Sequence, residues 1–180
     1  TLVHGIYKTV KSYDLKVLLV VLNSKPATTF YRLLHDIQGK VFAKISLENL
    51  GAFPLPEITL NNQQILVEKA DLMLSLNKDL QEQSQKFQRN LQREFQLSTL
   101  PKKLQDWYLL SYAEFIKELE KQKVKLSLSQ KAEWEEYFTA ESAKVNAIKT
   151  QINATDKAID AMVYELYGLS EEEIEIVEKS

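Results

Sequence analysis

The sequence predicts an α+β fold that is predominantly helical, and three observations lead to this prediction. Six of the eight glycine and proline residues lie within the first 56 positions, so the front of the chain is rich in turns while the rest can form long helices. Short runs in the front part have the β-branched and aromatic content of strands. Beyond position 60, apolar residues recur at seven-residue spacing. We therefore expect a small mixed α/β subdomain followed by a long antiparallel helical hairpin.

Two short strands are expected in the front part. Residues 6–10 are rich in β-branched and aromatic side chains, and residues 40–46 alternate lysine with apolar residues, as a half-exposed strand does. Residues 53–58 are expected to be extended, because a proline keeps the residue before it out of the α region.

Two helices are expected between these strands. Asp14 is placed to cap a helix over residues 15–23, whose leucine and valine content indicates deep burial. Pro26 suits the first turn of a second helix, which we expect over residues 27–34.

The rear of the chain is expected to form long helices. Residues 62–95 contain no glycine or proline, and a second helical stretch is expected over residues 104–123. Ser127 and Gln130 form a capping-box pattern that would begin a third helix ending at Tyr167. The apolar stripe of the first of these helices consists of Leu66, Met73, Leu80 and Phe87, with Ala70 and Leu91 at intermediate positions.

A short capped helix is expected at the C-terminus. Gly168 suits the left-handed residue that ends many helices, and Ser170 with Glu173 forms another capping-box pattern. The expected domains are a partial α/β domain over residues 1–60, a helical spacer over 61–168 and this helix over 169–180.

Composition excludes several classes of site. The chain has no cysteine, so disulfides and thiolate metal sites are impossible, and its two histidines are far apart. The longest apolar run has six residues, far fewer than the ~20 that span a bilayer, and no leader peptide precedes it, so we expect a cytoplasmic protein without a membrane anchor. Because the chain begins with threonine, we expect it to be a piece of a longer protein.

No catalytic, cofactor-binding or metal-binding residues are expected in this chain. It has no glycine-rich phosphate loop, no Asn-Pro-Pro turn of an adenine methyltransferase and no Glu-x-Lys element of a restriction nuclease. The acidic clusters at 133–136 and 171–173 are better explained as solvated helix faces and helix starts. The aromatic residues Trp107, Trp134, Tyr137 and Phe138 could stack on bases, but their helical spacing favours core packing.

A mildly basic front part makes double-stranded DNA a candidate partner. Residues 1–60 carry seven Lys/Arg and four Asp/Glu, a net charge of +3, whereas residues 61–180 carry sixteen and twenty-one, a net charge of −5. Lysine and arginine would hold phosphates, and amide or arginine side chains would read base edges. The candidate DNA-binding residues are Tyr7, Lys8, Lys11, Asn23, Lys25, Arg32, Gln38, Lys40 and Lys44.

Several segments resemble the C-terminal part of type IIG restriction-modification enzymes and related adenine-specific DNA methyltransferases. The last 22 residues, with Ile-Asp-x-x-Val-Tyr-x-Leu-Tyr-Gly-Leu-Ser-Glu-Glu-Glu-Ile, resemble the extreme C-terminus of those enzymes most specifically. Other stretches resemble the TaqI-like specificity domain and its helical tail in the same order: Leu18–Lys25 with its Asn-Ser-Lys, Ile45–Ile58 with its Pro-Leu-Pro, Trp107–Leu119 and Ala132–Phe138.

The resemblance implies a role in DNA sequence specificity. The front part would read the target, and the helices would act as a spacer and as a brace against a methyltransferase domain upstream in the same polypeptide. S-adenosylmethionine, and magnesium where a nuclease is fused, would bind elsewhere in the intact enzyme.

Two alternatives stay open at this point. Pro-Leu-Pro followed by a long helix also fits a type I restriction specificity subunit, or half of one, in which paired helices set the spacing of two half-sites. The second alternative is a helical-hairpin scaffold that binds protein and not DNA.

Overall fold

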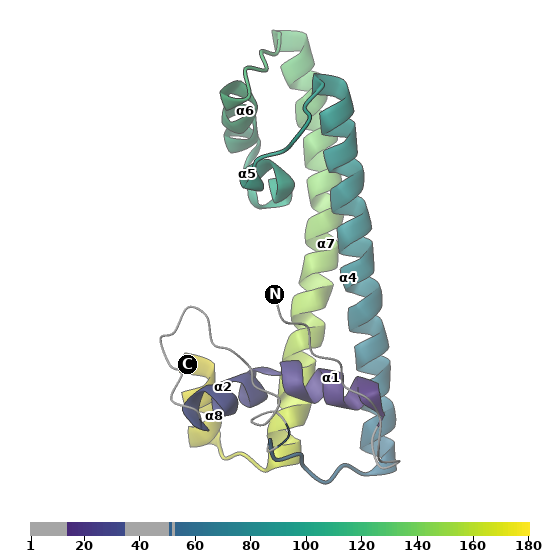
Figure 1. Ribbon diagram of the computed structural model, residues 1–180, viewed down its shortest axis with the longest axis vertical. Helices are drawn as coiled ribbons and strands as arrows, with labels where there is room; N and C mark the ends of the chain where they lie inside the picture. The colour runs from purple at the N-terminus through teal and green to yellow at the C-terminus, as the bar shows by residue number, and fades with distance from the viewer. Residues whose placement is uncertain (1–13, 35–50, 52) are drawn as a thin grey trace. The chain divides into compact units, whose positions relative to one another are not determined.

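The computed structural model of the chain describes residues 14–34, 51 and 53–180 (Figure 1). In chain order the helices are α1 (Leu15–Asn23), α2 (Lys25–Leu34), α4 (Leu60–Phe95), α5 (Lys102–Gln105), the 3₁₀ helix η1 (Trp107–Leu109), α6 (Tyr112–Lys121), α7 (Leu128–Tyr167) and α8 (Glu171–Lys179).

The expected α+β class is wrong. Helices hold 81% of the described residues, and none of those residues lies in a strand, so the fold is all-α over the part that the structure describes. Residues 53–58 lie outside any helix or strand, and their two prolines lack the N–H groups that a sheet ladder needs. The strands expected over residues 6–10 and 40–46 lie outside the described residues. Within the described part of residues 1–60, the expected mixed α/β subdomain is thus replaced by helices and by an irregular segment that includes residues 53–58.

Local capping explains where the front helices begin. The Asp14 carboxylate accepts the Lys16 N–H at 2.8 Å, and α1 has the predicted bounds. The second helix begins two residues earlier than expected, so Pro26 lies in the first turn of α2, as predicted.

Capping also sets the ends of the rear helices as predicted. Ser127 and Gln130 make both reciprocal hydrogen bonds of a capping box at the start of α7. Gly168 has φ of +64°, and a second capping box joins Ser170 and Glu173 at the start of α8. The sequence signals for these boundaries are confirmed.

The single helix expected over residues 104–123 is wrong, because the structure divides this stretch into α5, η1 and α6. The Trp107 side chain is fully buried in the core, and the backbone changes there from the α-helix α5 to the short 3₁₀ helix η1. A capping box between Ser111 and Glu114 then begins α6. A Ser-x-x-Glu pattern was present in the sequence and marks this restart.

The chain forms two compact units, which we describe separately. Unit 1 contains the described part of Thr1–Met73 together with Ala154–Ser180, and unit 2 is Leu74–Asn153. In unit 1, α1 packs against the first part of α4 and the last part of α7. Its buried core consists of Val17, Val20, Val21, Leu66, Ala70, Ile159 and Val163.

Unit 2 is built around an aromatic core. The Phe87 ring of α4 stacks on Trp107 with a centroid separation of 3.7 Å and on Tyr137 of α7 at 5.4 Å. Such rings bury large apolar areas and add geometric preference to the packing. The four aromatic residues that could have stacked on bases, Trp107, Trp134, Tyr137 and Phe138, all belong to this cluster, so their assignment to the core is confirmed.

Candidate functional site

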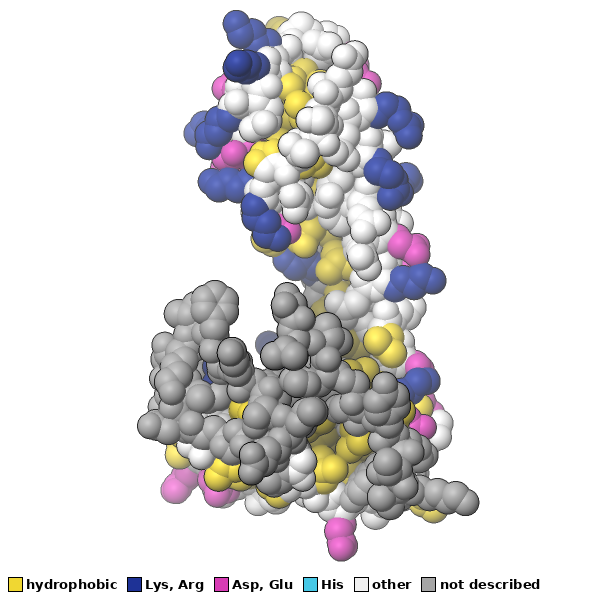
Figure 2. Space-filling view, in the orientation of Figure 1, with side chains coloured by type: hydrophobic (Ala, Val, Ile, Leu, Met, Phe, Trp, Pro, Cys, Tyr) yellow, Lys and Arg dark blue, Asp and Glu magenta, His cyan; other side chains and the backbone are white. Residues whose placement is uncertain are grey.

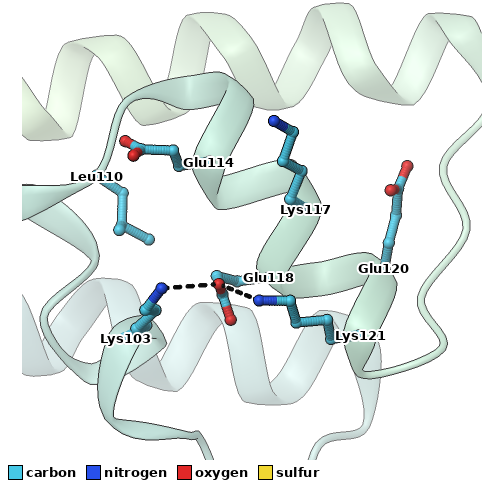
Figure 3. A pocket seen from close by; sticks show the side chains of 7 residues that line it. All are labelled: Lys103, Leu110, Glu114, Lys117, Glu118, Glu120 and Lys121. Carbon is cyan, nitrogen blue, oxygen red and sulfur yellow. Dashed lines mark hydrogen bonds and ion pairs between the residues drawn. The ribbon is translucent and has the colours of Figure 1, made fainter.

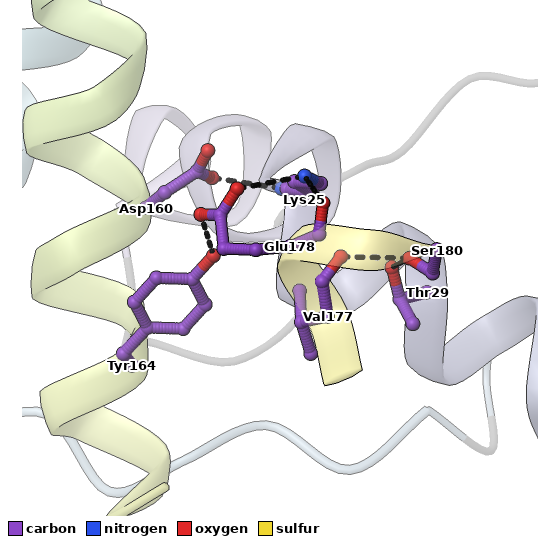
Figure 4. Close-up of polar contacts among 7 residues, drawn as sticks. All are labelled: Lys25, Thr29, Asp160, Tyr164, Val177, Glu178 and Ser180. Carbon is purple, nitrogen blue, oxygen red and sulfur yellow. Dashed lines mark hydrogen bonds and ion pairs between the residues drawn. The ribbon is translucent and has the colours of Figure 1, made fainter. Parts of the chain in front are cut away.

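A polar junction in unit 1 joins the start of α2 to the last turns of α7 and to α8 (Figure 4). It links residues that are far apart in the chain, and we call it the α2–α8 junction. Its polar side chains are Lys25, Thr29, Asp160, Tyr164, Glu178 and Ser180.

Asp160 of α7 caps the N-terminus of α2. Its carboxylate accepts the backbone N–H of Lys25, the first residue of α2, at 2.8 Å across 135 residues of sequence. The first N–H groups of a helix have no intrahelical acceptor, so this bond satisfies one of them. Burial raises the pKa of Asp160, and the hydrogen bond from Lys25 opposes that rise.

Glu178 ties α8 to both other helices. The Lys25 ammonium donates to the Glu178 carboxylate at 2.8 Å and to its backbone carbonyl at 2.9 Å, while the Tyr164 hydroxyl donates to the carboxylate at 2.7 Å. The hydrogen bonds from Lys25 and then from Tyr164 hold the pKa of Glu178 below its usual range. Burial, followed by the contact with Glu178, raises the pKa of the Tyr164 hydroxyl.

The Pro-Leu-Pro segment joins the same unit. The Tyr167 hydroxyl at the end of α7 donates to the Pro54 carbonyl at 2.8 Å. Phe53 is buried in a small cluster with Ala27 and Tyr31 of α2, and Tyr167 packs against that cluster. The Asn-Ser-Lys, Pro-Leu-Pro and Tyr-Gly-Leu segments therefore assemble in one compact unit, although more than 100 residues separate the second from the third.

Three of the nine candidate DNA-binding residues are described, and they differ in accessibility. Asn23 donates its side-chain amide to the Leu19 carbonyl at 2.8 Å, and Lys25 belongs to the junction. Arg32 is exposed in the last turn of α2. The remaining candidates lie outside the described residues: Tyr7, Lys8, Lys11, Gln38, Lys40 and Lys44.

The junction residues on α7 and α8 were not predicted from the sequence. One signal could have pointed to Asp160. It follows Ile159 on a mainly apolar stretch of α7 in which Val163 and Tyr164 are also buried. A carboxylate in such a run needs a partner, because burying an unpaired charge is costly. The partner itself, a backbone N–H of α2, leaves no trace in the sequence.

Two surface hollows in unit 2 offer polar linings. The first, of about 630 Å³, lies beside α5 and α6, and Figure 3 shows Glu118 between Lys103 at 3.5 Å and Lys121 at 2.7 Å. Lysines already pair with its most buried acid, so this arrangement is explained as a brace between α5 and α6. The second, of about 450 Å³, is lined mainly by amides, namely Asn77, Gln81, Gln85, Gln88 and Gln105, with Leu80, Ser84, Asp106 and Tyr108.

The described residues offer neither a metal-binding cluster nor a membrane-spanning helix. The described residues contain no group of three or more acidic or histidine side chains that could hold a metal ion. Among the helices that the structure describes, none combines the length and apolarity needed to cross a bilayer.

A family model described as a domain of unknown function, DUF8810, matches residues 59–163. The chain belongs to this family. The DUF8810 match runs from just before α4 into the last turns of α7, so it includes all of unit 2. No curated protein and no solved structure gives a significant match.

Proposed function

We propose that this chain is a non-catalytic DNA sequence-specificity module of a bacterial restriction-modification enzyme. In this proposal it directs an adenine-N6 methyltransferase, located upstream in the same polypeptide, and any fused nuclease to a target site in double-stranded DNA. The enzyme would act in the cytoplasm. S-adenosylmethionine and magnesium would bind outside this chain, whose described residues offer no metal site.

One observation carries the proposal. The last 22 residues, which carry the most specific resemblance to such enzymes, lie in the same unit as the Asn-Ser-Lys and Pro-Leu-Pro segments and contact them through the pairs Lys25–Glu178 and Tyr167–Pro54. A tail that was only an appendage would not need to contact the Asn-Ser-Lys helix. The contacts favour a tail that packs against the DNA-reading part and stabilises it.

Arg32 gives this proposal a testable residue. It is exposed on α2, and a guanidinium in that position can pair with a phosphate or with guanine. In the proposal, α2 presents Arg32 to DNA while Lys25, at the other end of the helix, anchors α2 to α8.

The experiment selects DNA from a pool of randomised duplexes with the 180-residue chain and measures affinity for the enriched sequence by fluorescence anisotropy over a range of salt. We expect a single enriched motif and binding that weakens as salt rises. Arg32→Gln should lower the slope of log K against log salt by about one, whereas Lys125→Gln, an exposed cation in the loop between α6 and α7, should leave it unchanged.

Other outcomes would identify the alternatives. Two enriched half-sites at a fixed spacing would point to a type I specificity subunit. An absence of salt-sensitive binding and of any enriched motif would contradict the proposal and favour a protein-binding scaffold.

A further inference from the structure

The outer face of α4 in unit 2 carries a row of basic residues. Lys86, Arg89 and Arg93 are spaced by three and four residues, which places them on one side of the helix. All three are exposed, and none forms an ion pair with a described residue. Phe87 and Leu91, on the opposite side of the same turns, are fully buried, so the basic row points away from the core.

Acidic residues of α4 do not cancel this row, although the exposed Asp79 lies two turns before Lys86 on about the same side of the helix. Glu82, one turn before Lys86, is paired with Lys78 at 3.8 Å. Glu94 follows Arg93 in sequence and therefore lies about 100° around the helix from it. We call Lys86, Arg89 and Arg93 the α4 basic face.

The first turns of α7 in unit 2 have the opposite character. Glu133, Glu135 and Glu136 are exposed on α7, and no comparable acidic run occurs along the α4 edge, where Figure 2 shows basic side chains projecting. A polyanion would therefore be attracted to the α4 edge and repelled by the acidic part of α7.

The spacing of the α4 basic face suits a nucleic-acid backbone. Seven residues of helix separate Lys86 from Arg93, a rise of about 10 Å. One strand of B-DNA carries a phosphate about every 3.4 Å along the axis, so a row of this length faces about three phosphates. Arginine forms bidentate hydrogen bonds with phosphate, and lysine acts as a point charge.

We propose that the α4 basic face is a second DNA contact, which binds the sugar-phosphate backbone of the duplex without reading its bases. This inference rests on the proposed function. It assigns part of the helical region to DNA binding, whereas the resemblance implies only a spacer and a brace there. Because phosphate contacts carry no direct sequence information, the face should add affinity to selected and random DNA alike.

The test compares two triple variants with the unmodified chain in anisotropy titrations between about 50 and 200 mM salt. The first, K86Q/R89Q/R93Q, removes the α4 basic face, and the second, K117Q/K123Q/K125Q, removes three exposed cations from α6 and the following loop as a matched control. Glutamine is a good helix former, so the first variant should keep α4 folded. Both tryptophans lie in unit 2, so their fluorescence checks the fold of that unit.

We expect the α4 variant to lower the slope of log K against log salt by about three, and the control by less than one. The ratio of affinities for the selected and random duplexes should not change. If the unmodified chain binds DNA and the α4 variant matches either that chain or the control, the second contact is overturned while the proposed function stands. If the unmodified chain shows no salt-sensitive binding, both are overturned.

Discussion

Asp160 illustrates how a single side chain connects distant parts of the chain. It is a buried carboxylate whose pKa is raised by burial, and its hydrogen bond goes to the backbone of Lys25 rather than to the ammonium group. The energetic value of Asp160 therefore lies in accepting a hydrogen bond at the start of a helix, and its charge is not required for that.

Substitutions at Asp160 should separate the hydrogen bond from the charge. Asp160→Ala leaves the Lys25 N–H without an acceptor and should lower the free energy of unfolding by about 1–2 kcal/mol. Asp160→Asn keeps an acceptor oxygen and should cost less than half as much. Asp156→Ala, one turn earlier and exposed, is the control and should change stability by less than about 0.5 kcal/mol. Urea unfolding followed by circular dichroism measures the free energy of unfolding of all three variants. Equal decreases for Asp160→Ala and Asp160→Asn would show that the charge of Asp160 contributes to stability and would contradict this account.

At the scale of elements, helix boundaries were predictable where they depend on neighbouring residues. Asp14, the Ser127–Gln130 pair and Gly168 each act within a few residues of sequence, and the structure has helix ends at these places. The break within residues 104–123 was not expected, because it follows from the burial of Trp107 against Phe87 of another helix. The two strands expected in the front part lie outside the described residues and stay predictions, since a short apolar run alone fits either a strand or a buried helix.

Gly168 tests the account of the boundary between α7 and α8. Its φ of +64° is costly for any residue with a Cβ, and no atom of the described residues lies within 4 Å of an added methyl group. Gly168→Ala should therefore lower the free energy of unfolding by about 1 kcal/mol through backbone strain alone. Gly51→Ala is a matched control, because it has equal space and no positive φ, and should change stability by less than about 0.5 kcal/mol. A Gly168→Ala chain as stable as the control would mean that the boundary is not strained.

At the scale of the whole molecule, the chain brings its front and its end together in unit 1. The contact between Lys25 and Glu178 spans 153 residues, and the contact between Tyr167 and Pro54 spans 113. The segments that make these contacts are recognisable in the sequence, but no pattern in the sequence indicates that they lie together. Such pairing depends on tertiary structure, which periodicity and capping patterns do not encode.

The most direct test of the proposed role of the tail compares two substitutions in α8 for their effect on DNA affinity. Val177 is the buried apolar residue of α8, whereas Ile176 beside it is 61% exposed. Val177→Asp should detach α8 from α2 and weaken binding of the selected duplex at least about tenfold, which is about 1.4 kcal/mol. Ile176→Asp should bind within about threefold of the unmodified chain, and tryptophan fluorescence should show unit 2 intact in both. Equal affinities for the two variants, or no DNA binding by the unmodified chain, would contradict the claim that the tail packs against a DNA-reading module and stabilises it.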